Sequence, residues 1–132
     1  MKKRKTIIFD GEKLFLKVNS YMNNGRMAII AYTDEELYGD ITINLPYSYL
    51  ENDKEGFIEP YTKMSGLENR LIKLGIIEKV IDNTKYNYGE YDRVRFNLEK
   101  LKEYDPEGVT QYERMLQEEN EEDKEEDEED EF

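Results

Sequence analysis

The chain has 132 residues, of which 39% are charged, and its 32 acidic and 19 basic residues give a net charge of −13. This length allows one modest core, because a domain of this size buries roughly two-thirds of the surface that its unfolded chain exposes. Cysteine and histidine are both absent, which excludes disulfides, thiolate nucleophiles, the usual catalytic triads and most transition-metal sites.

The first predicted element is a β-hairpin near the N-terminus. A basic segment, residues 1–5, precedes a β-branched and aromatic run from Thr6 to Phe9. Asp10-Gly11 is a turn signal, and Leu14 to Asn19 then alternates apolar and polar residues. The apolar run after the basic residues is too short for a signal peptide, and no run reaches the roughly 20 apolar residues of a membrane span. We therefore expect a soluble, cytoplasmic protein without membrane contact.

The centre of the predicted sheet comes next. Asn23-Asn24-Gly25 tolerates positive φ and is the strongest turn signal in the chain. Met27 to Tyr32 is apolar at every position, which predicts a central strand covered on both faces. Ile41 to Leu45 alternates and is followed by proline, which is typical of a half-buried strand. Between these two strands, Thr33 to Asp40 is predicted to be an acidic loop.

The second half of the chain predicts one short helix and two further strands. Residues 47–61 are interrupted by proline, glycine and asparagine, and we expect them to be irregular. Ser65, with Glu68 three residues later in capping-box position, predicts a short helix that Gly75 ends. An edge strand is expected at residues 76–81. A second strand is expected at residues 91–98, where alternation resumes.

A C-terminal helix is predicted to begin after Asp105. Asp105 is a good N-cap and Pro106 suits the first helical position. Val109, Tyr112, Met115 and Leu116 then supply an apolar stripe that can pack on the body. The apolar pattern stops at this point, and residues 118–132 are predicted to form an acidic tail that is disordered or a frayed extension of the helix.

These elements predict an α+β fold in a single domain, residues 6–117, between the basic segment and the acidic tail. The fold class expected is a small antiparallel sheet of four to six strands, with one short packed helix and a C-terminal helix that leads into the tail. The sequence leaves the oligomeric state open.

Three segments carry a resemblance to a known protein family. They are Tyr-Met-Asn-Asn-Gly at 21–25, Thr-Ile-Asn-Leu-Pro at 42–46 and Phe-Asn-Leu-Glu-Lys-Leu at 96–101. The body resembles a small uncharacterised family of Firmicutes plasmid, phage and conjugative-element proteins. Residues 21–25 are also similar to the Tyr-Asn-Asn-Gly opening of acidic antirestriction proteins that imitate DNA, with Met22 inserted here. The first resemblance implies a mobile-element setting, where small proteins often act against host defence, and it assigns no functional residue.

Most of the negative charge is concentrated at the C-terminus. Residues 118–131 include twelve acidic residues and one lysine, a net charge of −11, which leaves −2 for residues 1–117. Closely spaced carboxylates can imitate duplex phosphates, which carry about one charge per 1.7 Å of axis, and so occupy the basic groove of a nucleic-acid-binding protein. Alternatively, the tail only keeps the protein soluble. Divalent cation binding is a third possibility, although the glycine turn of a calcium loop is missing.

We therefore predict a non-enzymatic inhibitor of the anti-CRISPR or antirestriction type, which blocks a basic, nucleic-acid-binding host nuclease and binds no nucleic acid itself. No catalytic residue, metal ligand or cofactor is predicted. The alternative is a general interaction or accessory module, and a small hydrolase is a minor third. The predicted partner-binding residues are carboxylates of the loop and the tail, namely Asp34, Glu35, Glu36, Asp40, Glu118, Glu119, Glu121, Glu122, Asp123, Glu125, Glu126 and Asp127.

Arginine and tyrosine side chains are further candidate binding groups. Arg93 and Arg95 are expected on the outer face of a strand, where they pair with acidic residues of neighbouring strands or bind an anion. The chain contains 11 tyrosines, which are expected to pack half-buried at the rim of the core or to serve as interface residues.

Overall fold

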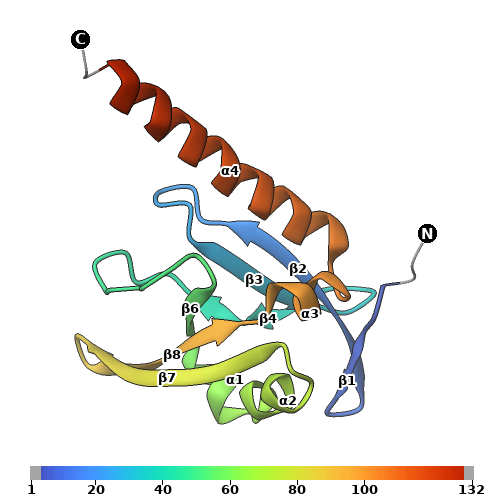
Figure 1. The fold of residues 1–132 in the computed structure, drawn as a ribbon. Helices are drawn as coiled ribbons and strands as arrows, with labels where there is room; N and C mark the ends of the chain where they lie inside the picture. The colour runs from blue at the N-terminus through green and yellow to red at the C-terminus, as the bar shows by residue number, and fades with distance from the viewer. Residues whose placement is uncertain (1–3, 130–132) are drawn as a thin grey trace.

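The computed structural model describes the backbone of residues 4–129 and the side chains of residues 4–119 and 121. Within these residues the chain forms eight strands and four helices, with the strands divided between two antiparallel sheets (Figure 1). The predicted α+β class and C-terminal helix are confirmed. The strands form two sheets of four, whereas the sequence predicted one sheet of four to six.

The first sheet has the strand order β1-β2-β3-β4. Its strands are β1 (Ile7–Phe9), β2 (Glu12–Ser20), β3 (Met27–Tyr32) and β4 (Leu37–Asp40). The predicted N-terminal hairpin is confirmed, because β1 pairs with β2 and the turn residues Asp10 and Gly11 take φ values of 51° and 76°. Gly25 takes a φ of 71° in the turn from β2 to β3, a conformation that glycine adopts without steric cost.

Strand β3 lies inside this sheet, as predicted, but only one of its faces is fully covered. Met27, Ile29 and Ala31 are buried. Ile30 and Tyr32 point to the opposite face, since side chains alternate along a strand, and they are only half-buried there. The continuous apolar run therefore overstates how much of β3 is covered.

The segment predicted as an acidic loop is half strand. Residues 33–36 form a tight turn, in which Thr33 Oγ1 accepts hydrogen bonds from the N–H groups of Glu35 (3.3 Å) and Glu36 (3.2 Å). The remaining residues form β4, which pairs antiparallel with β3. Their sequence, Leu-Tyr-Gly-Asp, shows no periodic apolar pattern, and the strand forms because it pairs with β3.

The second sheet has the strand order β5-β6-β8-β7. Its strands are β5 (Thr42–Ile43), β6 (Glu55–Ile58), β7 (Ile77–Tyr86) and β8 (Gly89–Phe96). Strand β6 lies in the region predicted to be irregular and is buried at every position. The hairpin of β7 and β8 is longer than predicted, because Asn87, at a φ of 53°, makes a tight turn where the sequence indicated a polar connection.

The helices are α1 (Pro60–Met64), α2 (Leu67–Lys73), α3 (Leu98–Lys102) and α4 (Pro106–Glu129). The sequence predicted α2 and α4 but neither α1 nor α3, which have only five residues each. The predicted capping box at the start of α2 does not form. Gly66, with a φ of 93°, is the N-cap residue of α2, and Ser65 instead ends α1.

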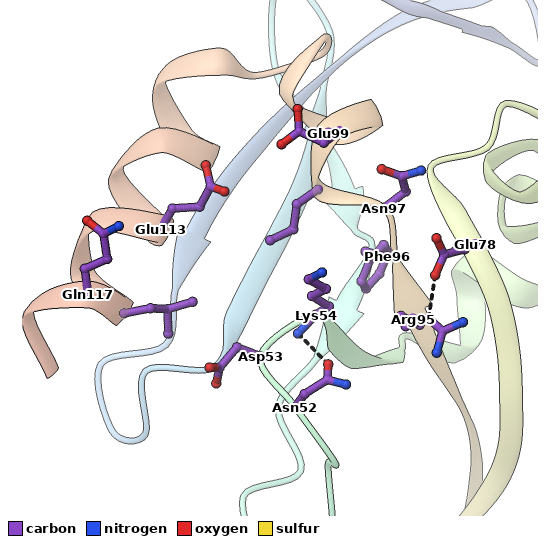
Figure 2. Close-up of a pocket in the computed structure, with 12 residues that line it drawn as sticks. Asn52, Asp53, Lys54, Glu78, Arg95, Phe96, Asn97, Glu99, Glu113 and Gln117 are labelled. Atoms are coloured by element: carbon purple, nitrogen blue, oxygen red, sulfur yellow. Dashed lines mark hydrogen bonds and ion pairs between the residues drawn. The ribbon is translucent and has the colours of Figure 1, made fainter. Parts of the chain in front are cut away.

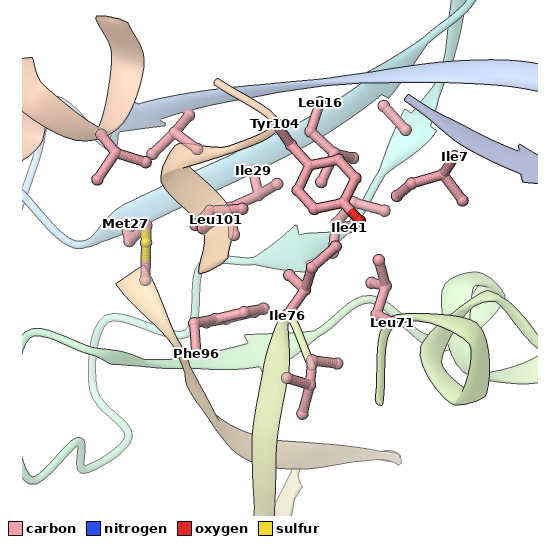
Figure 3. Packing of buried hydrophobic residues seen from close by; sticks show 14 of the residues in the cluster. Ile7, Leu16, Met27, Ile29, Ile41, Leu71, Ile76, Phe96, Leu101 and Tyr104 are labelled. Carbon is pink, nitrogen blue, oxygen red and sulfur yellow. The ribbon is translucent and has the colours of Figure 1, made fainter. Parts of the chain in front are cut away.

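The hydrophobic core lies between the two sheets and continues under α3 (Figure 3). Leu16 and Ile29 come from the first sheet and Phe96 from the second, and all three are buried. Ile41, between β4 and β5, is also buried, and its N–H donates to the carbonyl of Ile29 at 2.9 Å. This short connection ties the two sheets together around a shared core.

Candidate functional site

The first half of α4 is fixed to the body at several points. Asp105 caps the helix, with its Oδ1 accepting from the Gly108 N–H at 3.2 Å, while its Oδ2 accepts from the Val18 N–H of β2 at 2.8 Å. Tyr112 is buried, and its hydroxyl donates to the carbonyl of Asp53 at 2.7 Å. Burial raises the pKa of the Tyr112 hydroxyl, so it stays a donor. These contacts set the direction of the helix.

The acidic half of α4 extends past the end of the first sheet. Figure 1 shows α4 running alongside the β2–β3 hairpin and continuing beyond its turn. Glu118, Glu119 and Glu121 are exposed, and none of them forms an ion pair with another described residue. The side chains of five further predicted residues lie outside the described part of the chain, namely Glu122, Asp123, Glu125, Glu126 and Asp127. The backbone of α4 is helical to Glu129. The disorder predicted for residues 118–132, as the alternative to an extension of the helix, stays a prediction.

The two predicted acidic regions are not brought together. Asp34, Glu35 and Glu36 are exposed in the turn after β3, and Asp40 is exposed at the end of β4. The turn is at the opposite end of β3 from Gly25, where α4 passes the sheet with Glu119 and Met115 close to the glycine. The loop and the tail therefore form two separate acidic surfaces.

A groove of about 750 Å³ lies beside the first half of α4 (Figure 2). Glu113, Leu116 and Gln117 form the wall on the helix, at the three- and four-residue spacing that places side chains on one face. The opposite wall includes Phe96 and Leu98 at the end of β8 and the start of α3. The loop of residues 52–54 closes one end. Three of the twelve lining residues, Phe96, Leu98 and Leu116, are apolar, and we call them the floor of the groove. The other nine are polar or charged, and we call them its rim.

The rim of the groove carries more carboxylates than cations. Its carboxylates are Asp53, Glu78, Glu99 and Glu113, and its cations are Lys54 and Arg95. Arg95 is paired with Glu78 at 2.5 Å, and Glu113 is paired with Lys102, outside the groove, at 3.0 Å. The rim is therefore mildly negative, and it leads directly into the acidic half of α4.

The outward-facing arginines of β8 form ion pairs with carboxylates of neighbouring strands, as the sequence predicted. Arg93 Nη1 donates to buried Glu55 at 2.8 Å, and its Nη2 donates to Asp82 of β7 at 2.8 Å. The hydrogen bond with Asp82 and the nearby carboxylates raise the pKa of Arg93. Arg95 pairs with Glu78. These pairs leave neither arginine as an anion site on this face.

A cluster of titratable side chains lies between α2 and the second sheet, and it was not predicted from the sequence. Glu68 is 5% exposed. Burial raises its pKa to about 7, and neighbouring Asp92 adds to the rise. Asp92 accepts from Lys63 at 3.1 Å and Asn83 at 2.9 Å. From the sequence, Glu68 was predicted to cap the helix. No local pattern indicates that this turn is buried, so the sequence contains no signal for the cluster.

The basic N-terminal segment is partly described. Arg4 donates through Nε to the carbonyl of Tyr104 at 2.8 Å and through Nη2 to the carbonyl of Leu16. Lys5 pairs with Glu103 at 2.5 Å. Both residues therefore contact the connection before α4. Lys2 and Lys3 lie outside the described residues.

Two kinds of feature are absent from the described residues. Among the side chains that the structure describes, those of residues 4–119 and 121, no three or more acidic groups are placed to hold a metal ion. Within residues 4–129, no helix combines the length and apolar character needed to cross a membrane.

Comparison with known proteins identifies the family of this chain. No curated protein and no solved structure matches it. A family model described as a domain of unknown function, DUF4313, matches residues 15–116. The match begins inside β2, includes β3 to β8 and the first half of α4, and ends at Leu116, just before the acidic segment. The chain therefore belongs to the DUF4313 family.

Proposed function

We propose that this protein is a non-enzymatic anti-defence inhibitor from a mobile genetic element. It acts in the cytoplasm on a basic, nucleic-acid-binding host nuclease of the CRISPR or restriction type. The acidic half of α4 occupies the groove in which that nuclease holds nucleic acid. The partner is a protein, and the inhibitor itself has no need to bind DNA or RNA.

The observation that carries this proposal is the charge density of α4. From Glu118 to Glu129 the helix contains ten acidic residues and one lysine, a net charge of −9 over twelve residues. With a helical rise of about 1.5 Å per residue, this is roughly one net charge per 2 Å of axis. Duplex DNA carries about one per 1.7 Å. A surface that binds a phosphate backbone is therefore offered nearly the same charge per unit length.

The attachment of α4 supports the same proposal. Its first half is capped by Asp105 and held through buried Tyr112, so the acidic half starts from a fixed position and direction. A rod held in this way loses less freedom on binding than a free tail does. The loop acids Asp34 to Glu36 lie at the other end of β3 and are not needed for this mode of binding.

A second candidate is a general interaction or accessory module whose acidic segment only provides solubility. The end of the family match at Leu116 favours it, because the shared part of the fold stops before the charged segment. This candidate predicts that the tail charges can be removed without loss of partner binding.

Two charge-matched full-length variants separate these candidates. The tail-amide variant replaces five tail carboxylates (E122Q, D123N, E125Q, E126Q, D127N), and the loop-amide variant replaces five carboxylates elsewhere (E12Q, D34N, E35Q, E36Q, D40N). Nucleic-acid-binding proteins retained from a host lysate by the wild-type protein are purified. Their binding to labelled duplex DNA is then titrated with each protein.

The inhibitor proposal predicts that the wild-type and loop-amide proteins displace the DNA and that the tail-amide variant is at least tenfold weaker. Displacement should also weaken by about tenfold or more between 50 and 300 mM salt, since phosphate-like contacts are screened. Equal displacement by the tail-amide and wild-type proteins would leave the accessory-module candidate. Retention of no nucleic-acid-binding protein would contradict the inhibitor proposal.

A further inference from the structure

We propose that the groove beside α4 receives an apolar or aromatic side chain from a basic amphipathic segment of the partner. This inference rests on the proposed function, because it identifies the surface of the body that the same basic partner contacts. It adds a specific anchor to what is otherwise a non-specific attraction between charges.

The shape and floor of the groove support an apolar anchor. Its volume of about 750 Å³ lies within the range of roughly 300–1,000 Å³ that is typical of ligand pockets. Phe96 and Leu98, in the wall opposite α4, are buried, and Leu116 on α4 is half-buried. An inserted side chain would cover the remaining exposed part of Leu116 and remove its own apolar surface from water, which favours the complex.

The charges around the groove support a basic occupant. The rim has four carboxylates and two cations. Arg95 pairs with Glu78, and Lys102 outside the groove pairs with Glu99 at 3.8 Å and Glu113 at 3.0 Å, so these seven residues carry a net charge of −1. Glu113 and Gln117 line the groove, and Glu121 follows at the next four-residue step on the same helix. A segment lying along this face of α4 therefore passes from the apolar floor toward the acidic half of the helix.

This arrangement favours a particular kind of partner segment. Its large apolar side chain enters between α4 and the end of β8, while its lysines or arginines extend along the acidic half of α4. A segment with basic residues alone would meet the acidic surface but leave the groove unfilled. The groove therefore distinguishes among basic partners, which an acidic rod cannot do by charge alone.

Two synthetic peptides test this directly. One is a lysine- and alanine-rich peptide of 14 residues with a single central tryptophan, and the other has alanine in place of the tryptophan. Both carry a fluorescein label, so that anisotropy reports their affinity at 150 mM salt. The protein contains no tryptophan, so the emission of the unlabelled tryptophan peptide reports only its own surroundings.

Two substitutions on exposed faces of α4 provide the matched pair. Gln117→Phe fills the groove, whereas Gln111→Phe places the same side chain on the same helix away from it. Both residues are exposed, so neither substitution disturbs the core. Far-UV circular dichroism of each variant checks that the fold is retained.

The groove proposal predicts that the tryptophan peptide binds at least tenfold more tightly than the alanine peptide and that its emission shifts to shorter wavelength. Gln117→Phe should remove this preference, and Gln111→Phe should keep it. Equal binding of the two peptides to the wild-type protein, no emission shift, or a preference that survives Gln117→Phe would overturn the proposal.

The tail-amide variant distinguishes this proposal from the proposed function. If both peptides bind equally and the tail substitutions weaken both, the groove proposal is wrong and the acidic half of α4 still attracts basic partners. If the tryptophan preference persists and the tail substitutions change neither affinity, the groove stands and the role given to the tail is wrong.

Discussion

Replacement of Glu68 by glutamine is expected to stabilise the protein, and by more at high pH than at low pH. Glu68 is buried beside Asp92, which raises its pKa from 4.5 to about 7. The folded state therefore retains a proton that the unfolded state releases between these two pH values. The free energy of unfolding must fall as the pH rises through this interval, because the unfolded state binds fewer protons there. Glutamine carries no charge at any pH and is free of this loss.

The shift of about 2.5 pKa units corresponds to at most about 3.4 kcal/mol, at 1.36 kcal/mol per unit. Part of this is already present at pH 5, which leaves at most about 2.5 kcal/mol to develop between pH 5 and pH 8.5. Lys63, which pairs with Asp92, is half exposed, so solvent and side-chain movement reduce the effect. We expect the advantage of Glu68→Gln to grow by about 1 to 2 kcal/mol over this range.

Urea unfolding, followed by far-UV circular dichroism at pH 5.0, 6.0, 7.0 and 8.5, measures this difference. The lowest pH stays above the isoelectric point of about 4.5, where the protein is least soluble. Glu12→Gln, at an exposed position on β2, is the matched control and should show no growing advantage. An advantage of Glu68→Gln that is constant or shrinks with pH would refute the assignment of Glu68 as a buried, proton-retaining acid.

Three further substitutions test the contacts that hold the site. Asp105→Ala removes both the cap of α4 and the acceptor for the Val18 N–H, so we expect a loss of about 2 to 4 kcal/mol in urea unfolding, and Asp105→Asn should restore part of it. Gly108→Ala raises helix propensity but places a Cβ 2.1 Å from Asp105 Oδ2 and 2.6 Å from the Val18 carbonyl oxygen; we expect a fall in Tm, and a rise would contradict this packing. Arg93→Met leaves the carboxylate of Glu55 buried without its charge partner, which should cost about 3 to 5 kcal/mol in the same unfolding assay.

Local patterns were sufficient for the elements whose signals lie within a few residues. The β1–β2 hairpin follows from alternation and Asp10-Gly11, and the start of α4 follows from Asp105 and Pro106. The pairing of Arg93 with acidic residues was also predictable, because a half-buried arginine on a strand needs a neighbouring carboxylate. Each of these features depends on a local residue pattern that is visible in the sequence.

The features that depend on long-range packing were not predictable in this way. Strand β4 has no periodic pattern and exists because β3 offers it a partner. Glu68 matches the pattern of a helix cap, and only the packing of α2 against the second sheet buries it beside Asp92 of β8. The groove has walls from α4 and from the end of β8, and no segment of the sequence contains both.

The acidic segment was predictable from the sequence only in part. Its composition and its position at the end of a helix were evident from the sequence, whereas its separation from the acidic turn at residues 33–36 required the fold. That turn lies at the end of β3 far from Gly25, beside which α4 passes. The proposed competition with nucleic acid therefore rests on the acidic half of α4 and not on this turn.

The most direct test of that account is competition between this protein and duplex DNA for the purified partner, measured with the wild-type and tail-amide proteins. The account predicts displacement of the DNA by the wild-type protein and at least a tenfold weaker displacement by the tail-amide variant at the same salt concentration. Equal displacement by both proteins would contradict the central role of the acidic half of α4.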